Sequence, residues 1–227
     1  MYGQGSVITG LSEDSDLDLI LVWEEDVPSA PTLPDATATS QGELLLEQSR
    51  LDGYDIDLMH IPRLTFDGWL SELEQGEGWS DTAWPSPIYV AAGLAEAKLL
   101  LDPTGHGAAE RSRVQVPAAA LVARVRNQLE AAAPGFIKEL RSAAEKEHRW
   151  LHASLAVQLH KLTYTAWFLV EGHYPPFPKY LPQWCERYGM NSHVRSLEAA
   201  YWTAPDPTTA LEALVAAVLD LPITRLA

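Results

Sequence analysis

The sequence has 227 residues, with 16 Lys and Arg against 31 Asp and Glu, which gives a formal charge of −15 at pH 7. Its length fits one or two domains, and 47% hydrophobic with 21% charged residues is a globular composition. Its charge argues against nucleic acid as the main partner, its lack of a long apolar stretch excludes a membrane span, and its single cysteine, Cys185, excludes an intrachain disulfide.

Apolar runs and alternation predict the elements of the first hundred residues. The run Leu17–Trp23 is nearly continuous in apolar residues after Asp18 and predicts a central strand. The segment Tyr54–Ile61 alternates as a half-buried strand does. The other expected elements, in chain order, are a strand at Val7–Ile8, a loop over Glu24–Ser40, a short helix or edge strand at Glu43–Arg50, a helix at Leu64–Glu74, a helix starting within Tyr89–Leu94 and a strand at Ala97–Leu101.

The pattern becomes helical from Pro117 onward. The clearest helix is expected over Ala143–Glu171, where leucines recur at intervals of three and four residues, and Gly172 is placed to end it. A final helix is expected over Thr208–Leu219. We therefore predict an α+β fold, in which a small mixed β-sheet domain over residues 1–110 precedes a helical domain over residues 111–227.

The segment that carries chemistry begins with Gly5-Ser6 and ends with Asp16-Leu17-Asp18 at the start of the central strand. Side chains two residues apart on a strand point to the same face. The two carboxylates would repel each other unless a cation lay between them, and Mg²⁺ typically takes one or two carboxylates together with substrate phosphates. A Gly-Ser turn offers backbone N–H groups and a hydroxyl to such a phosphate.

A two-metal site needs a third carboxylate, and Asp57 is the best candidate for it. Asp57 lies in the middle of the strand predicted over Tyr54–Ile61, where it could pair beside Asp18 across a sheet. Asp55 shares the same face of that strand and is the alternative.

This pattern resembles the DNA polymerase β superfamily of nucleotidyltransferases. Members carry Gly-Ser, then about ten residues, then Asp-x-Asp on a strand, and a further Asp on a later strand. The Gly-Ser-x-x-x-Gly and Ser-Asp-Leu-Asp-Leu forms resemble the small-molecule branch, which includes antibiotic nucleotidyltransferases. The resemblance covers residues 5 to about 61, and Leu99–Gly105 is similar to the strand and turn that often close such a catalytic domain.

The resemblance implies that a nucleoside monophosphate is transferred from a nucleoside triphosphate, with ATP expected, to a hydroxyl of a small molecule, and that pyrophosphate is released. Asp16 and Asp18 would bridge two Mg²⁺ ions, and Asp57 would hold the ion that activates the hydroxyl. Gly5 N–H and Ser6 would hold the β and γ phosphates. Because the chain is so acidic, nucleotide binding should depend on Mg²⁺. We expect a cytoplasmic protein.

Two alternatives remain open at the level of sequence. The first is a non-catalytic interaction protein of the same fold, for example an antitoxin-like protein. It is favoured by the short segment before Gly5 and by the absence of a basic residue in Val7-Ile8-Thr9. The second is nucleotidyl transfer to RNA or protein, although the acidity of the chain weighs against an RNA acceptor. The sequence leaves the acceptor and the oligomeric state undetermined.

Five further residues of the helical part are of a type that can contact a phosphate or a metal ion. His160-Lys161 and Lys179 are candidates for contact with a triphosphate. His148 and His152 lie four residues apart, but they lack the carboxylate that accompanies a zinc-binding helix.

Overall fold

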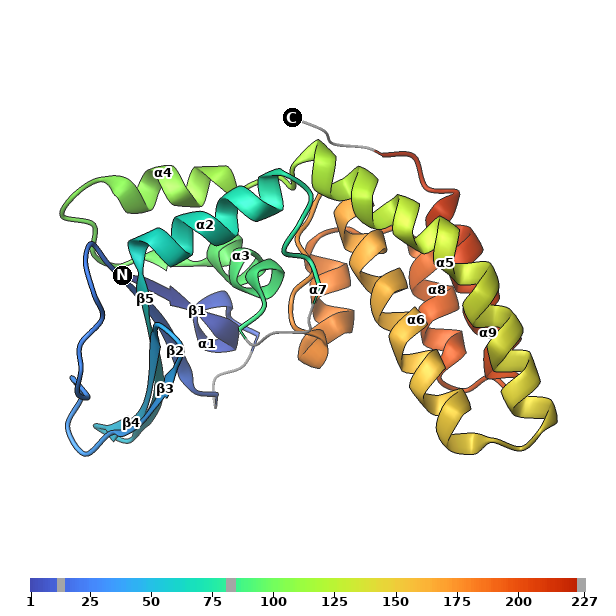
Figure 1. Cartoon of the computed structure of the whole chain (residues 1–227), viewed down its shortest axis with the longest axis horizontal. Coiled ribbons are helices and arrows are strands. Elements are labelled where there is room, and N and C mark those ends of the chain that lie inside the picture. Colours follow the sequence, from blue (N-terminus) through green and yellow to red (C-terminus); the bar gives the residue numbers. More distant parts are fainter. Residues whose placement is uncertain (12–14, 81–84, 224–227) are drawn as a thin grey trace. The chain divides into compact units, whose positions relative to one another are not determined.

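The computed structural model describes residues 1–11, 15–80 and 85–223 (Figure 1). The chain forms two compact units: Met1–Leu73 with Ser80–Gln115, and Glu74–Trp79 with Val116–Ala227. The first unit holds a sheet and helices, and in the second unit the described residues form helices. The fold is therefore α+β, as the sequence predicts. The boundary predicted between residues 110 and 111 falls inside helix α4 (His106–Arg113).

The first unit is built on a mixed sheet with the strand order β3-β4-β5-β2-β1-β6. Strands β2 and β5 run parallel to each other, and the other neighbouring strands are antiparallel. The strands are β1 (Tyr2–Gln4), β2 (Leu17–Trp23), β3 (Thr37–Gln41), β4 (Leu44–Leu51), β5 (Tyr54–Pro62) and β6 (Lys98–Leu99).

Three of the predictions made for the first unit, a strand, a loop and a short helix or edge strand, were wrong or incomplete. Val7–Ile8 belongs to a short helix, α1 (Gly5–Thr9), which is closed by donation from Thr9 Oγ1 to the Gly5 carbonyl at 2.9 Å. The segment predicted as a loop, Glu24–Ser40, includes the first four residues of β3, whose sequence Thr-Ala-Thr-Ser-Gln lacks the apolar alternation of a half-buried strand. Because β3 takes the edge position, β4 is an interior strand.

Helices cover the sheet of the first unit at β1. They are α2 (Arg63–Glu74), α3 (Pro87–Glu96) and α4, and Figure 1 shows α2 and α4 side by side. The ring of Tyr2 stacks on Phe66 of α2, with centroids 6.4 Å apart, and its hydroxyl donates to the Glu110 carboxylate of α4 at 2.5 Å. Arg63 pairs with the same carboxylate. This buried network ties β1, α2 and α4 together.

The second unit is helical over the residues that the structure describes. Helix α5 (Ala119–Glu145) packs against α6 (Arg149–Val170) and α9 (Pro207–Leu219), and α9 also packs against α8 (Ser192–Tyr201). A short 3-10 turn, η1 (Pro178–Tyr180), leads into α7 (Leu181–Arg187). None of the helices among the described residues combines the length and the apolar character that crossing a membrane would require.

The long helix expected over Ala143–Glu171 is interrupted. Helix α5 ends at Glu145, and α6 begins at Arg149. Between them Glu147 has a φ of +56°, a left-handed conformation that breaks the helix. At the other end Gly172 has a φ of +88°, which agrees with its predicted role after the last turn of α6.

Candidate active site

Four polar residues stand level with one another across four adjacent strands of the first unit. The register pairs Gln48 of β4 with Asp57 of β5, Asp57 with Asp18 of β2, and Asp18 with Gln4 of β1. Residues directly opposite each other on neighbouring strands point to the same face of a sheet. We call these four residues the polar row. Two of the three predicted carboxylates, Asp18 and Asp57, are therefore direct neighbours.

Gly5 lies against the carboxylate of Asp18. A Cβ atom placed on Gly5 would lie 1.9 Å from Asp18 Oδ2 and 2.9 Å from Asp18 Cγ, and Gly5 has a φ of +82°. No residue with a side chain could bring its backbone so close to this carboxylate without moving it. Gly93 of α3 is related to Gln4 in the same way, with its Cβ position 2.1 Å from Gln4 Oε1. The two glycines make room for polar side chains of the polar row.

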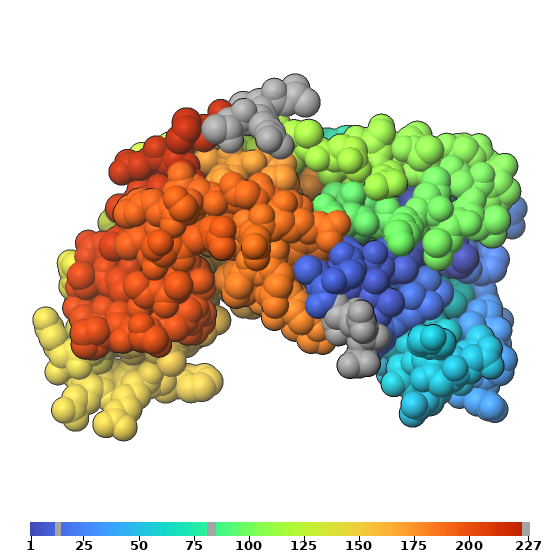
Figure 2. Space-filling view, turned by 180° about the vertical axis from the view of Figure 1, so that it is seen from behind, coloured from blue at the N-terminus to red at the C-terminus, as the bar shows by residue number. Residues whose placement is uncertain are grey.

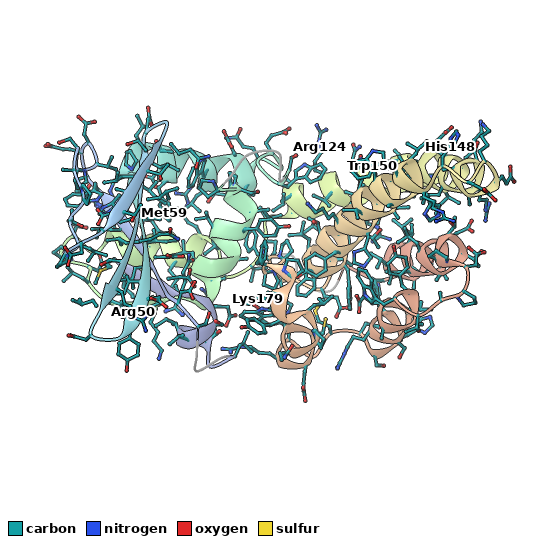
Figure 3. All side chains as sticks on the ribbon, turned by 90° about the horizontal axis from the view of Figure 1, so that it is seen from below. Arg50, Met59, Arg124, His148, Trp150 and Lys179 are labelled. Atoms are coloured by element: carbon teal, nitrogen blue, oxygen red, sulfur yellow. The ribbon has the colours of Figure 1, made fainter. Side chains whose placement is uncertain are left out.

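The two aspartates of β5 have different surroundings. Asp57 is half-buried, and its Oδ1 accepts a hydrogen bond from Gln48 Nε2 at 3.1 Å. The side chain of Asp55 is 64% exposed, and its Oδ1 lies 3.7 Å from Arg50 Nε. Arg50 and Met59, which are labelled in Figure 3, lie two residues beyond Gln48 and Asp57 in their strands. This arrangement favours Asp57 over Asp55 as the partner of Asp18.

The remaining predicted carboxylate, Asp16, lies outside the polar row. Asp16 is exposed and directly precedes β2, and residues 12–14, between it and α1, lie outside the described part of the chain. Within the described residues, no group of three or more His, Cys, Asp and Glu side chains could hold a metal ion. Asp18 and Asp57 nevertheless offer hard oxygen donors at neighbouring positions, as Mg²⁺ requires. The residues thus fit a divalent ion through two carboxylates.

Helix α1, which begins with Gly5 and Ser6, belongs to the dark blue part of the first unit that is seen in Figure 2. Ser6 keeps 9% of its surface exposed, and its carbonyl accepts a hydrogen bond from Leu11 N–H at 2.8 Å. Gly10 ends α1 with a φ of +74°. Ser6 thus directly follows the glycine that lies against the Asp18 carboxylate, but Ser6 itself is largely enclosed.

A second polar group, which the sequence did not reveal, is buried farther along the same strands. Glu47 of β4 is 1% exposed and lies 2.7 Å from Nε2 of the fully buried His60 of β5. Trp23 Nε1–H donates to His60 Nδ1 at 2.9 Å. Glu47 also accepts hydrogen bonds from the backbone N–H groups of Thr32 and Leu33. The group fastens the loop before β3 to the sheet.

Burial and hydrogen bonding act in opposite directions on the carboxyl group of Glu47. Burial raises its pKa, but the N–H donors and His60 outweigh that effect, so that the pKa lies below its usual value. For His60, burial lowers the pKa more than the nearby Glu47 raises it. The pair therefore consists of an ionised carboxylate and a neutral imidazole. We interpret it as a part of the fold rather than of the candidate active site.

A cavity of about 510 Å³ opens at the end of β2 opposite to Asp18. Carboxylates of Glu24, Glu25, Asp26 and Glu43 line it, together with Arg63. Arg63 Nε donates to Glu24 at 2.7 Å. The cavity is therefore strongly acidic, and it does not include the polar row.

The histidines and lysines that the sequence offered as phosphate or metal ligands belong to the helical unit, where His152, His160 and Lys179 each have a neighbour of their own. Burial lowers the pKa of His160, whose ring stacks on Tyr201 at 5.2 Å, so that a neutral imidazole stands where contact with a triphosphate would need a cation. His152 Nε2 lies 3.0 Å from Thr208 Oγ1, and among the described residues neither His152 nor His148 belongs to a group of three or more potential metal ligands. Lys179 Nζ lies over the ring of Tyr180, 5.3 Å from its centroid.

The comparisons with known proteins include a structural likeness. No protein-family model matches the chain, and no curated protein does either. A solved structure, that of a nucleotidyltransferase-like protein from Exiguobacterium sibiricum 255-15, is similar with a TM-score of 0.47 and 10% sequence identity. The alignment covers 96% of this chain and 69% of that one. A likeness at this level carries no weight for activity.

Proposed function

We propose that the protein is a metal-dependent nucleotidyltransferase that moves a nucleoside monophosphate from a nucleoside triphosphate to a hydroxyl group and releases pyrophosphate. ATP is the nucleoside triphosphate that we expect. The observation that carries the proposal is the pairing of Asp18 with Asp57 in the β2–β5 register, with the backbone of Gly5 against the Asp18 carboxylate. Gly5, Asp18 and Asp57 come from three separate parts of the sequence motif, and the fold brings them together.

Each residue has a definite role in this proposal. Asp18 and Asp57 would hold Mg²⁺, and Asp16 would complete the set when nucleotide is bound. When bound, the metal supplies charge stabilisation for the attacking and leaving oxygens. The carboxylate of Asp57 would accept the proton of the acceptor hydroxyl. Gly5 N–H and Ser6 would contact the β and γ phosphates.

The acceptor in this proposal is a small molecule. The chain carries 15 more acidic than basic residues. Such a field repels nucleic acid and concentrates cations, so a hydroxylated acceptor that bears amines fits better than RNA does. The same field makes nucleotide binding dependent on Mg²⁺, which offsets the charge of the triphosphate.

Titration calorimetry with ATP, in the presence and absence of Mg²⁺, tests the site. Asp18→Asn should abolish Mg²⁺-dependent binding and keep the fold, because it removes a repulsive charge rather than a packing contact. Asp55→Asn removes an equal charge from the same sheet face and serves as the control. Near wild-type binding by Asp18→Asn would rule out the assignment.

Labelled nucleoside triphosphates, incubated with Mg²⁺ and separate pools of tRNA, protein and small metabolites, test the acceptor. Label in the small-molecule pool is expected. Label confined to tRNA or protein would favour the alternative acceptors. Label in no pool, together with a lack of nucleotide binding, would favour a non-catalytic interaction protein.

A further inference from the structure

We propose that Gln48 is a positioning residue, which orients the carboxylate of Asp57 for a divalent cation. This inference rests on the proposed function, because it concerns the same site. It starts from one contact: Gln48 Nε2–H donates to Asp57 Oδ1 at 3.1 Å, between residues that are directly opposite in the β4–β5 register. Gln48 is not part of the sequence motif that predicted the site.

The order of the strands determines toward which side of Asp57 this hydrogen bond pulls the carboxylate. Asp57 stands between Gln48 on the β4 side and Asp18 on the β2 side. Donation from Gln48 therefore holds Oδ1 toward β4. The other oxygen of the same carboxylate is left on the side of Asp18, where a cation bridging the two aspartates would lie.

The chemistry of the donor matters as well. A glutamine amide fixes a carboxylate without adding charge, so the negative charge that attracts a divalent cation is kept. Two residues away on the same strands, the cation Arg50 lies beside Asp55. An arginine brings a positive charge to its carboxylate, whereas the neutral amide of Gln48 adds no charge beside Asp57. The sheet thus treats its two neighbouring aspartates differently.

Loss of an outer partner of a metal ligand typically costs 10–100-fold in metal affinity. Gln48→Met keeps the length of the side chain and removes the donor. Because Gln48 is exposed, the substitution should leave the fold intact. We expect Mn²⁺, a paramagnetic substitute for Mg²⁺, to bind about 10-fold more weakly. Gln48→Asn, which keeps an amide too short to reach Asp57, should weaken binding in the same way.

The experiment measures binding of Mn²⁺ alone by electron paramagnetic resonance, so its readout is independent of turnover. Gln115→Met is the matched control, because Gln115 is an exposed glutamine of the same unit whose amide donates to the carbonyls of Ala95 and Arg111. Thermal unfolding is followed for each variant. Asp57→Asn, alone and combined with Gln48→Met, completes a double-mutant cycle.

The outcomes separate this inference from the proposed function. Weaker Mn²⁺ binding by Gln48→Met, with no further loss when it is added to Asp57→Asn and no loss in Gln115→Met, supports it. Wild-type affinity in Gln48→Met, while Asp57→Asn loses Mn²⁺, overturns the role of Gln48 and leaves the metal site standing. Wild-type affinity in Asp57→Asn removes the metal site and the role of Gln48 together.

Discussion

Gly5→Ala should separate the local geometry of the site from the stability of the fold. The new Cβ would lie 1.9 Å from Asp18 Oδ2, where ordinary contact begins at 3.4 Å, so the carboxylate oxygen must move by about 1.5 Å. Displacement of a reacting or binding group by about 1 Å can cost roughly 100-fold in rate. The left-handed backbone at φ +82° adds about 1–2 kcal/mol to the cost of folding.

Gly10→Ala is the matched control for this prediction. Gly10 lies at the other end of α1, has a φ of +74°, and has nothing within 4 Å of its Cβ position. Both variants should therefore lose free energy of unfolding in urea through the left-handed backbone, Gly5→Ala the more because of its contact with Asp18, but only Gly5→Ala should lose Mg²⁺-dependent ATP binding, by about 100-fold. Equal binding by the two variants, or an equal loss in both, would refute the reasoning from the Asp18 contact.

Three further predictions concern single side chains. Asp57→Ala should slow transfer about a thousandfold, by analogy with the loss of other strong transition-state charge contacts, and Asp55→Ala should slow it far less; the reverse ranking in steady-state assays would reassign the role. Burial lowers the pKa of His160 below 6.5, so the unfolded chain takes up a proton first and the free energy of unfolding falls as pH drops below about 6.5. His160→Gln should reduce that slope by up to about 1.4 kcal/mol per pH unit, and an unchanged slope in urea titrations would contradict this. Asn191 caps α8 by accepting from His193 N–H at 3.0 Å, so Asn191→Ala should cost about 1 kcal/mol in the same assay, and no loss would show that the cap is not stabilising.

The strands with a clear apolar pattern could be predicted from the sequence. Leu17–Trp23 matches β2, and Tyr54–Ile61 matches β5 to within one residue. The polar strand β3 could not be predicted, because its backbone is ordered by pairing with β4 rather than by burying its own side chains. The break after α5 was also hidden, because neither glycine nor proline marks the turn around Glu147, where the sequence reads Glu-Lys-Glu-His.

The site could be predicted only where residue type and spacing suffice. The sequence suggested that Asp57 could stand beside Asp18, and the structure pairs them. The sequence could not indicate a role for Gln48, because its hydrogen bond to Asp57 depends on the register of two strands, which cannot be derived from the sequence. It could not show that Glu47 is buried beside His60 either, since an isolated glutamate in a strand is usually solvated.

The parallel register of β2 and β5 restricts how this sequence can evolve. One register sets both Asp18 opposite Asp57 and, farther along the same strands, the contact of Trp23 with His60. A single residue inserted between these two points in either strand would turn every later side chain to the opposite face, so that the two arrangements could no longer form together. Insertions between the strands, in the loop before β3, leave the register untouched. Variation in length should therefore accumulate in that connection, while both strands keep their lengths.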